Sequence, residues 1–246
     1  MKSFRAGMVV ATIVSLLVCI AGCDALPGKP QEADRPLRPS QVKDFAQLYS
    51  DNCSGCHGRD GTFGAAAQLQ NPVFLALLTD TDLRRVIAQG VPGTAMPPFA
   101  HSAGGALTDE QIDILINGMR QRWARPEVVG NAALPPFQSD SPGDAARGHD
   151  VYATSCKSCH GPHGSGTAKI GSIVDPSYLA LVSDQALRTL VIAGRSDLEH
   201  PDWRHYPLGQ PLTAQQVTDV VAWLAAQRAQ FPGQPYPQGP RGESQR

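Results

Sequence analysis

Two short motifs of cysteine and histidine have residue types and a spacing that can hold an iron-containing cofactor. Segments 53–57 (CSGCH) and 156–160 (CKSCH) share the pattern C-x-x-C-H. On a helical turn, residues i and i+3 lie on one face, so both thiols of a pair can reach the two vinyl groups of one porphyrin. The pattern therefore predicts two covalently bound haem c groups. The predicted attachment residues are Cys53, Cys56, Cys156 and Cys159, and the predicted proximal iron ligands are His57 and His160.

Zinc binding and thiol redox chemistry are the two alternatives for these cysteines. A zinc site would need both C-x-x-C pairs to converge in one domain, whereas the pairs lie 103 residues apart in parallel repeats. A thioredoxin-like pair would leave the histidine after each motif, and the repeat itself, unexplained. Haem attachment accounts for both features.

Composition and charge indicate a loop-rich globular protein without a nucleic-acid footprint. The chain has 246 residues and a formal net charge of -1, with no basic run or interleaved aromatic stripe. Glycine (24) and proline (21) are both plentiful, which favours small domains with many loops over long regular elements. We therefore expect no nucleic-acid partner.

The N-terminus has the pattern of a secretory signal. Lys2 and Arg5 precede an uncharged, mostly apolar run over 6–22, which is short for a membrane span. The run ends in IAGC, which resembles a bacterial lipobox, and this implies cleavage before Cys23 and lipidation of its thiol. Asp24 would, by the same resemblance, favour the periplasmic side of the inner membrane. The alternatives are a plain signal peptide or an uncleaved anchor in which Cys23 is inert.

The chain after the signal is an internal repeat. Segment 71–77 (NPVFLAL) matches 175–181 (DPSYLAL) at an offset of 104 residues, and 107–108 matches 212–213 at an offset of 105. A nearly constant offset indicates two copies of one domain, 41–125 and 143–231. The remaining segments are predicted to be a signal peptide (1–22), two linkers (23–40 and 126–142) and a disordered tail (232–246).

Each copy has helical periodicity. In the first copy, Thr108 and Gln111 form a predicted capping box before an apolar face, and Thr213 and Gln216 do the same in the second. The residues of the two apolar faces are Ile112, Leu115, Ile116 and Met119, and Val217, Val220, Val221 and Leu224. A middle helix is predicted before Gly90 and before Gly194, on Leu83, Val86 and Ile87 and on Leu187, Leu190 and Val191. A short helix with Phe45 and Tyr49, or Val151 and Tyr152, precedes each motif.

Together these features resemble class I cytochrome c in a tandem, dihaem form. The resemblance implies an all-α protein with two small domains, each folded around a covalent haem. It also implies that an N-terminal helix crosses a C-terminal one and that the haem edge is exposed. It covers nearly all of the chain after the signal.

The same resemblance implies a distal methionine in a loop before the last helix of each domain. Segment 90–99 (GVPGTAMPPF) closely matches that loop and makes Met96 the expected ligand. The alternative is that Met96 only fills the core. Met119 is the other methionine after the signal and lies on the apolar face of the last helix.

The second copy contains no methionine, so its sixth ligand must differ. The aligned loop is 194–203 (GRSDLEHPDW), in which His200 stands six residues after its glycine and before a proline, as Met96 does. A His160/His200 pair is therefore predicted, with His205 as the competitor. His163 is tethered too close to the proximal ligand and His149 belongs to the preceding helix. The remaining alternative is an exposed histidine and a five-coordinate iron.

The predicted function is transfer of single electrons between a donor and an acceptor redox protein, as an electron carrier and not an enzyme. The carrier would serve within or next to a membrane respiratory or photosynthetic complex. A thioether ligand raises haem potential relative to two imidazoles, so electrons would enter at the second copy and leave from the first. The alternatives are a dihaem peroxidase or thiosulfate-oxidising enzyme, if the second haem has an open sixth site, and a redox or gas sensor.

Overall fold

The computed structural model describes Gly28 and residues 35–207 and 209–229. The chain divides into two compact units, Met1–Gln41 and Val42–Arg246. Apart from the 3-10 helix η2 (Pro39–Gln41), every element below belongs to the second unit. The predicted signal segment 1–22, Cys23 and the tail 232–246 lie outside the described residues. No helix in the described part is long and apolar enough to cross a membrane.

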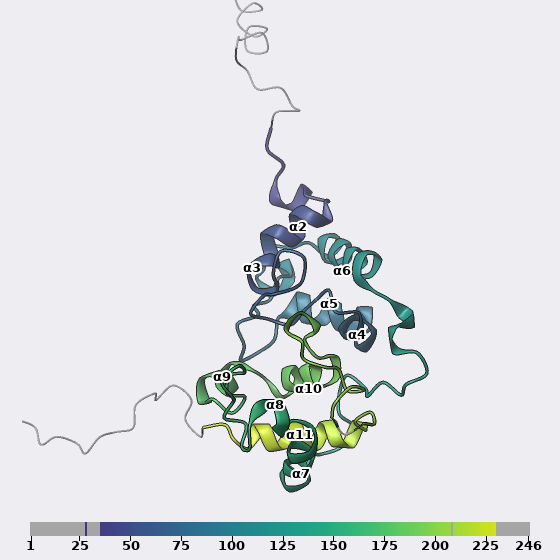
Figure 1. Ribbon diagram of the computed structural model, residues 1–246. Helices are drawn as coiled ribbons and strands as arrows, with labels where there is room; N and C mark the ends of the chain where they lie inside the picture. The colour runs from purple at the N-terminus through teal and green to yellow at the C-terminus, as the bar shows by residue number, and fades with distance from the viewer. Residues whose placement is uncertain (1–27, 29–34, 208, 230–246) are drawn as a thin grey trace, which may run out of the picture. The chain divides into compact units, whose positions relative to one another are not determined.

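The described residues of the second unit form helices and no strand, which confirms the predicted all-α class (Figure 1). The first copy contains α2 (Phe45–Asn52), α3 (Ser54–His57), α4 (Pro72–Leu77), α5 (Asp80–Gln89), η3 (His101–Ala103) and α6 (Asp109–Trp123), and η4 (Pro126–Val129) follows it. The second contains α7 (Ala145–Ser155), α8 (Lys157–His160), α9 (Pro176–Leu181), α10 (Asp184–Ala193), η5 (Ser196–Leu198) and α11 (Ala214–Ala225). The five α-helices of each copy therefore recur in the same order.

The helix starts are encoded locally by polar caps. Both predicted capping boxes are formed, Thr108 with Gln111 on α6 and Thr213 with Gln216 on α11. Each cap satisfies backbone N–H groups that the first helical turn leaves free and stabilises its helix by about 1 kcal/mol. Asn71 caps α4 with its side-chain oxygen, which accepts from Val73 N at 2.8 Å. Its Nδ2 also donates to Ala193 O of α10, in the second copy, at 2.9 Å. Asn71 therefore joins the two copies.

In each copy the first and last helices cross at a glycine. On α6, a Cβ at Gly118 would lie 2.0 Å from Cδ2 of Phe45 on α2. In the second copy the glycine is on the other helix, where a Cβ at Gly148 of α7 would lie 2.0 Å from the backbone oxygen of Asp219 on α11. Only a residue without a side chain allows such a close approach.

Aromatic rings fill the rest of each crossing. Tyr49 and Trp123 meet edge to face with ring centroids 5.3 Å apart, and Tyr152 and Trp223 stack at 4.2 Å. Such ring pairs contribute about 1 kcal/mol beyond the burial of their surface. The crossing that the family resemblance implied is therefore present in both copies, with different ring geometry.

An arginine holds the end of the short helix α4 or α9 in each copy. Arg120 donates to the backbone oxygens of Leu75 and Leu78, and Arg228 donates to those of Leu179 and Val182. The acceptors are offset by 104 residues, but the arginines are offset by 108, so sequence alignment does not pair them. Equivalent carbonyl groups of the two copies therefore accept hydrogen bonds from arginines at non-equivalent positions.

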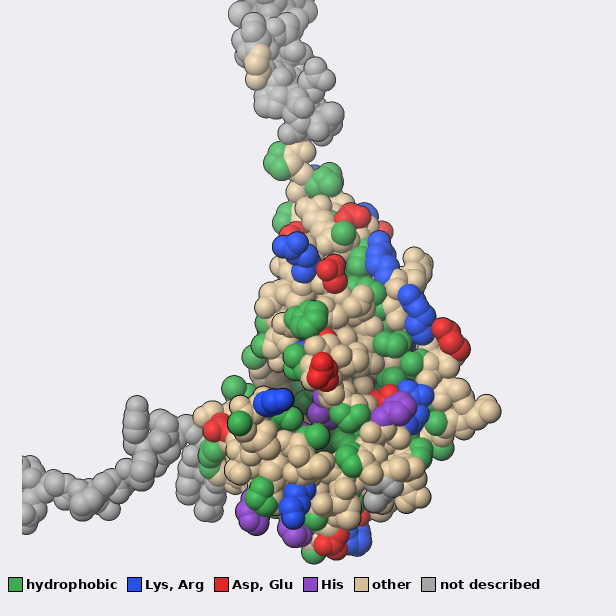
Figure 2. Space-filling view, in the orientation of Figure 1, with side chains coloured by type: hydrophobic (Ala, Val, Ile, Leu, Met, Phe, Trp, Pro, Cys, Tyr) green, Lys and Arg blue, Asp and Glu red, His purple; other side chains and the backbone are tan. Residues whose placement is uncertain are grey.

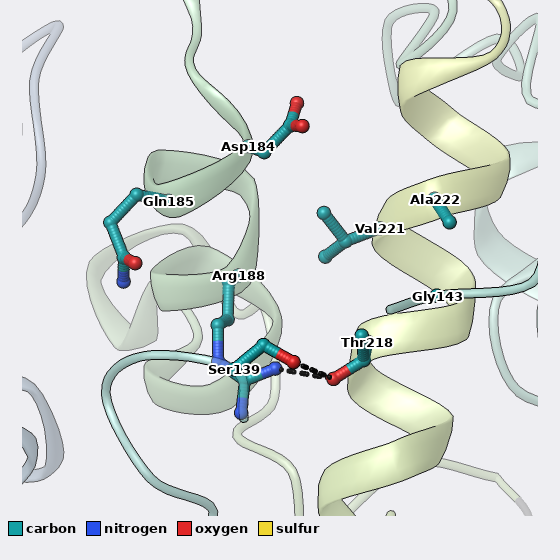
Figure 3. Close-up of a pocket in the computed structure, with 8 residues that line it drawn as sticks. All are labelled: Ser139, Gly143, Asp184, Gln185, Arg188, Thr218, Val221 and Ala222. Atoms are coloured by element: carbon teal, nitrogen blue, oxygen red, sulfur yellow. Dashed lines mark hydrogen bonds between the residues drawn. The ribbon is translucent and has the colours of Figure 1, made fainter. Parts of the chain in front are cut away.

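The core face of the second middle helix differs from the predicted one. On α10, Leu190 and Val191 are half-buried, while Arg188 and Ile192 are buried. Arg188 is buried because Thr218 Oγ1 on α11 accepts from its Nη1 at 2.8 Å and Pro136 O in the linker accepts from its Nη2 at 2.9 Å. Figure 3 shows Arg188 beside the pocket that these two helices and the linker enclose. The pocket is thus crossed by a side chain that already has its partners.

On the face drawn in Figure 2, acidic and basic side chains are interspersed and do not gather into one charged patch. This arrangement is in keeping with the formal net charge of -1. The face therefore presents no strong field of one sign.

Candidate haem sites

Each C-x-x-C-H motif lies on a one-turn helix that follows the first helix of its copy. Cys53 ends α2 and precedes α3, and Cys156 does the same between α7 and α8. In both motifs the first cysteine is half-buried and the second is exposed, and none of the four forms a disulfide. The thiols of a pair therefore share one helical turn, as attachment to one porphyrin requires.

Buried tyrosines position both motifs against the preceding helices. Tyr49 on α2 donates to the backbone oxygen of Gly58 at 3.0 Å, and Tyr152 on α7 donates to that of Gly161. Each acceptor is the residue directly after the motif histidine. The hydrogen bonds fix the end of the motif turn, and with it the histidine.

The first thiol of each motif is not activated as a nucleophile. Burial, with a smaller contribution from Cys56, raises the pKa of Cys53 to about 12. Burial, with Cys159, raises the pKa of Cys156 to about 12 in the same way. Thioredoxin-like pairs have lowered thiol pKa values, so the environment of these cysteines does not favour the thiol redox alternative.

The zinc alternative needs ligands that converge on one point. Among the residues that the structure describes, no three His, Cys, Asp or Glu side chains lie close enough to hold a metal ion together. The two C-x-x-C pairs thus belong to two separate sites, one in each copy.

The motif histidines differ in their second contact. The Nδ1 atom of His57 lies 2.8 Å from the backbone oxygen of Ala67, so it can donate there and leave Nε2 for the iron. The Nδ1 atom of His160 is buried and has no hydrogen-bond partner within the described part of the chain. A hydrogen bond at Nδ1 makes an imidazole a stronger donor to a metal. The two proximal histidines are therefore not equivalent.

The environment keeps these imidazoles neutral, as metal ligation requires. Burial lowers the pKa of His57, although the Ala67 carbonyl acts in the opposite direction. Burial also lowers the pKa of His160 and, together with the nearby His160, that of His200.

The loops that carry Met96 and His200 have the same backbone construction. Each starts at a glycine with a left-handed φ, +67° at Gly90 and +68° at Gly194. Both are closed by an equivalent hydrogen bond, from Val91 N to Met96 O at 3.0 Å and from Arg195 N to His200 O at 3.1 Å, and the second loop adds the reverse bond from His200 N to Arg195 O at 3.0 Å. The predicted equivalence of Met96 and His200 thus has a structural basis in the closure of both loops.

The separation of His160 and His200 fits one iron between them. Their ring centroids are 5.9 Å apart. A metal–imidazole nitrogen bond is about 2.0 Å, so two imidazoles on opposite sides of one metal ion have centroids roughly 6 Å apart. In the first copy, Met96 is half-buried in its loop and Met119 is fully packed in the core of α6. The donor sets therefore suit His/Met and His/His ligation.

The other candidate histidines lie elsewhere. His205 is 66% exposed and its Nδ1 lies 3.0 Å from Asp202 Oδ1. His163 is exposed, and His149 is exposed on α7 beside Trp223. Of the four candidates, only His200 is brought against His160.

One buried polar group in the second copy was not singled out by its sequence. The indole N–H of Trp203 is fully buried and has no acceptor among the residues that the structure describes. Indole is a donor only, and the carboxylates of a haem can supply the acceptor. Phe99 stands at this position in the first copy and has no such donor. The orphaned donor is a second observation that fits a haem in the second copy.

Comparison with known families identifies the domain to which each motif belongs. A model of the cbb3-type cytochrome c oxidase subunit III family matches residues 40–117, and a model of the cytochrome c family matches residues 145–227. The chain carries two cytochrome c domains in tandem. Two cytochrome c domains imply two covalently bound c-type haems, which supply one-electron redox chemistry. The exact domain limits, 41–125 and 143–231, stay predictions.

Curated relatives of this dihaem cytochrome include subunits of an oxidase. The chain is 26% identical over 169 residues to the cbb3-type cytochrome c oxidase subunit FixP of Sinorhizobium medicae, covering 63% of this chain and 52% of the relative. It is 26% identical over 165 residues to FixP of Bradyrhizobium diazoefficiens, with the same coverage of 63% and 52%. The chain thus spans about half the length of the curated relatives it matches.

A solved structure is also similar. It belongs to the reducing HAO-like protein complex Kustc0457/Kustc0458 of Kuenenia stuttgartiensis, with 16% identity and a TM-score of 0.40. The match covers 79% of this chain and 100% of that one. A similarity of this size says nothing about activity.

Proposed function

We propose that this dihaem cytochrome is an electron carrier that moves single electrons between two periplasm-facing redox proteins and has no catalytic reaction of its own. Electron transfer as such follows from the two cytochrome c domains. The observation that supports the narrower role is the second donor in each copy, on loops of the same construction. An iron with both axial positions occupied by the protein has no free site for a substrate.

The unequal donors support a direction of transfer. Met96 offers a thioether and His200 an imidazole, and the thioether gives the higher potential. The Ala67 contact to His57 acts the other way, because a stronger proximal donor stabilises the oxidised iron. Axial-ligand identity spans about 0.8 V across haem proteins and is the larger effect. Electrons therefore enter at the second copy and leave from the first.

The names of the relatives favour a respiratory setting over a photosynthetic one. Both FixP proteins are named as subunits of a cbb3-type oxidase. By this similarity the chain serves within or next to a membrane respiratory complex. The donor and the acceptor are redox proteins of that system.

A redox titration of the haem-loaded chain tests the carrier role. We expect two one-electron waves and slow or no binding of carbon monoxide in the reduced state, since Met96 and His200 occupy the sixth positions. Spectropotentiometry and stopped-flow mixing with carbon monoxide measure these properties. Rapid binding at the second haem would mean an open site there, and would favour an enzyme or a sensor.

We also propose that Cys23 carries a lipid that holds the mature chain on the periplasmic side of the inner membrane. The support is the sequence IAGC at 20–23. Cys23→Ala should release the protein into the soluble periplasmic fraction or block its processing, because two or more acyl chains are what give stable anchoring. Mass spectrometry of the membrane fraction measures the N-terminus. A chain that starts at Met1 would contradict lipidation at Cys23.

A further inference from the structure

A buried ion pair in the loop 194–203 of the second copy bonds to segment 63–66, which follows the haem motif of the first copy. Arg195 donates to the backbone oxygens of Ala66 at 3.0 Å and Gly64 at 3.1 Å, and its Nε donates to Asp197 Oδ1 at 2.8 Å. Asp197 Oδ2 in turn accepts from the backbone N–H of Phe63 at 2.7 Å. We call Arg195 and Asp197 the clamp.

Both charges of the clamp are largely removed from water. The side chains of Arg195 and Asp197 are 12% and 2% exposed. A buried ion pair is costly to desolvate, and removal of one partner leaves an uncompensated charge in a medium of low dielectric constant. The electrostatic effect of each charge therefore extends further than it would on an exposed surface.

The clamp lies between the ligand sites of the two copies. On one side, Arg195 and His200 exchange two backbone hydrogen bonds, of 3.1 and 3.0 Å. On the other side, Arg195 binds the carbonyl of Ala66, and the next carbonyl, of Ala67, is the acceptor for His57 Nδ1 at 2.8 Å. One residue thus bonds to His200 through its backbone and, through its guanidinium, to the segment that holds His57 in place.

The shared fold does not require the clamp. At the aligned positions of the first copy, 91–93, the residues are Val, Pro and Gly. That loop still closes on Met96 with the same backbone hydrogen bond. The charged pair in the second copy is therefore an addition to the loop, and the hydrogen bonds that its side chains make to Gly64, Ala66 and Phe63 reach the first copy.

We propose that Arg195 and Asp197 are positioning residues that fix the two haem sites in one relation and adjust both reduction potentials together. This inference rests on the proposed function, in particular on ligation by His57 and His200. A nearby positive charge favours the reduced state of a redox centre, and a negative charge disfavours it. Because the clamp borders both sites, loss of one of its charges changes both potentials in the same direction.

Two charge-removing variants give opposite predictions. Arg195→Gln leaves Asp197 unpaired and should lower both potentials, whereas Asp197→Asn leaves Arg195 unpaired and should raise both. Each reduction equilibrium should change about threefold to tenfold, where tenfold is 59 mV for one electron. Arg195→Lys keeps the charge but loses the planar fork of hydrogen bonds, so it should shift the potentials least.

A second arginine–aspartate pair in the same copy provides the matched control. Arg204 Nη2 donates to Asp202 Oδ2 at 2.8 Å, and the side chains are 19% and 13% exposed. Arg204 also contacts the backbone oxygen of Val128, in η4 and not in the motif loop of the first copy. Arg204→Gln should leave the upper wave, assigned to the first haem, unchanged.

The test is a spectropotentiometric titration of the full haem-loaded chain and its variants, together with hydrogen exchange of the amides at 63–68. Support requires shifts of opposite sign for Arg195→Gln and Asp197→Asn at both waves, and faster exchange at 63–68 in Arg195→Gln. The proposal is overturned if only one wave moves or if both reduction equilibria change by less than threefold. It is also overturned if Arg204→Gln shifts both waves as Arg195→Gln does. If Arg195→Gln does not fold, Asp197→Asn and Arg195→Lys decide alone. If the spectrum of the unmodified chain shows that the second haem is not ligated by His160 and His200, the proposed function is contradicted instead. The clamp variants keep both ligands, so their shifts test only the clamp.

Discussion

Exchange of the distal ligands is expected to move the two reduction waves toward each other. Met96→His should lower the upper wave and His200→Met should raise the lower one. Each shift should be roughly 0.1 V or more, a fraction of the about 0.8 V that axial ligands span. The reason is that each variant exchanges thioether and imidazole at one iron while the closure of its loop stays the same. Spectropotentiometry of the purified chain measures both waves.

The chain offers its own controls for this exchange. Met119→Leu removes the buried methionine of α6 and His205→Gln removes the exposed competitor histidine, and neither should move a wave by more than a small amount. The sulfur-to-iron charge-transfer band expected of the family should vanish with Met96→His and persist with Met119→Leu. A shift of the lower wave in His205→Gln, without one in His200→Met, would assign the ligand to His205.

Gly148→Val is expected to unfold the second domain or to destabilise it by at least about 3 kcal/mol. The crossing of α7 and α11 leaves no room for a side chain, because a Cβ at Gly148 would lie 2.0 Å from the backbone oxygen of Asp219. The obstacle is backbone that cannot turn aside as a rotamer can. Such a loss is a large share of the about 5–15 kcal/mol that stabilises a typical domain. Thermal unfolding followed by far-UV circular dichroism measures it.

Ala146→Val separates the steric effect from helix propensity. Ala146 lies on the same helix but is exposed, so this variant carries the β-branched penalty without the clash. We expect a loss of less than about 1 kcal/mol there. Equal losses in the two variants would mean that α7 and α11 do not approach each other as closely as the crossing requires.

Local sequence signals predicted the parts of the fold that depend on neighbouring residues. The capping boxes at Thr108 and Thr213, the helix ends at Gly90 and Gly194, and the order of the first, middle and last helix of each copy could all be predicted from spacing. Each of these features is decided within a few residues of the chain. Because the chain repeats, each predicted helix was supported by the same pattern at the matching position of the other copy.

Features that join distant segments could not be predicted in this way. Arg120 and Arg228 do the same work from positions that a constant offset does not align, because a long side chain reaches its acceptors from more than one place on a helix. The position of the crossing glycine, on the last helix α6 in the first copy and on the first helix α7 in the second, could not be predicted for a related reason. A crossing needs one small residue, and either helix can supply it.

The candidate site shows the same division. The attachment cysteines and proximal histidines follow from a contiguous motif, and His200 follows from the loop spacing. Arg195 had no signal of its own, since its partners at 64 and 66 lie about 130 residues away in sequence. Asp197 could not be predicted either, because its partner Phe63 is in the first copy and equally distant in sequence.

Asn71 gives the first domain a contact that the matching residue of the second domain cannot make. Its amide both starts α4 and donates to the last turn of α10, a combination that needs an oxygen and an N–H on one side chain. Asp175, at the matching position of the second domain, caps α9 with its carboxylate and has no N–H to give. A chimaera built from two second domains would keep every helix start and lose this bridge. One amide in place of a carboxylate thus gives the first domain a bond to the second that the second domain cannot return from the matching position.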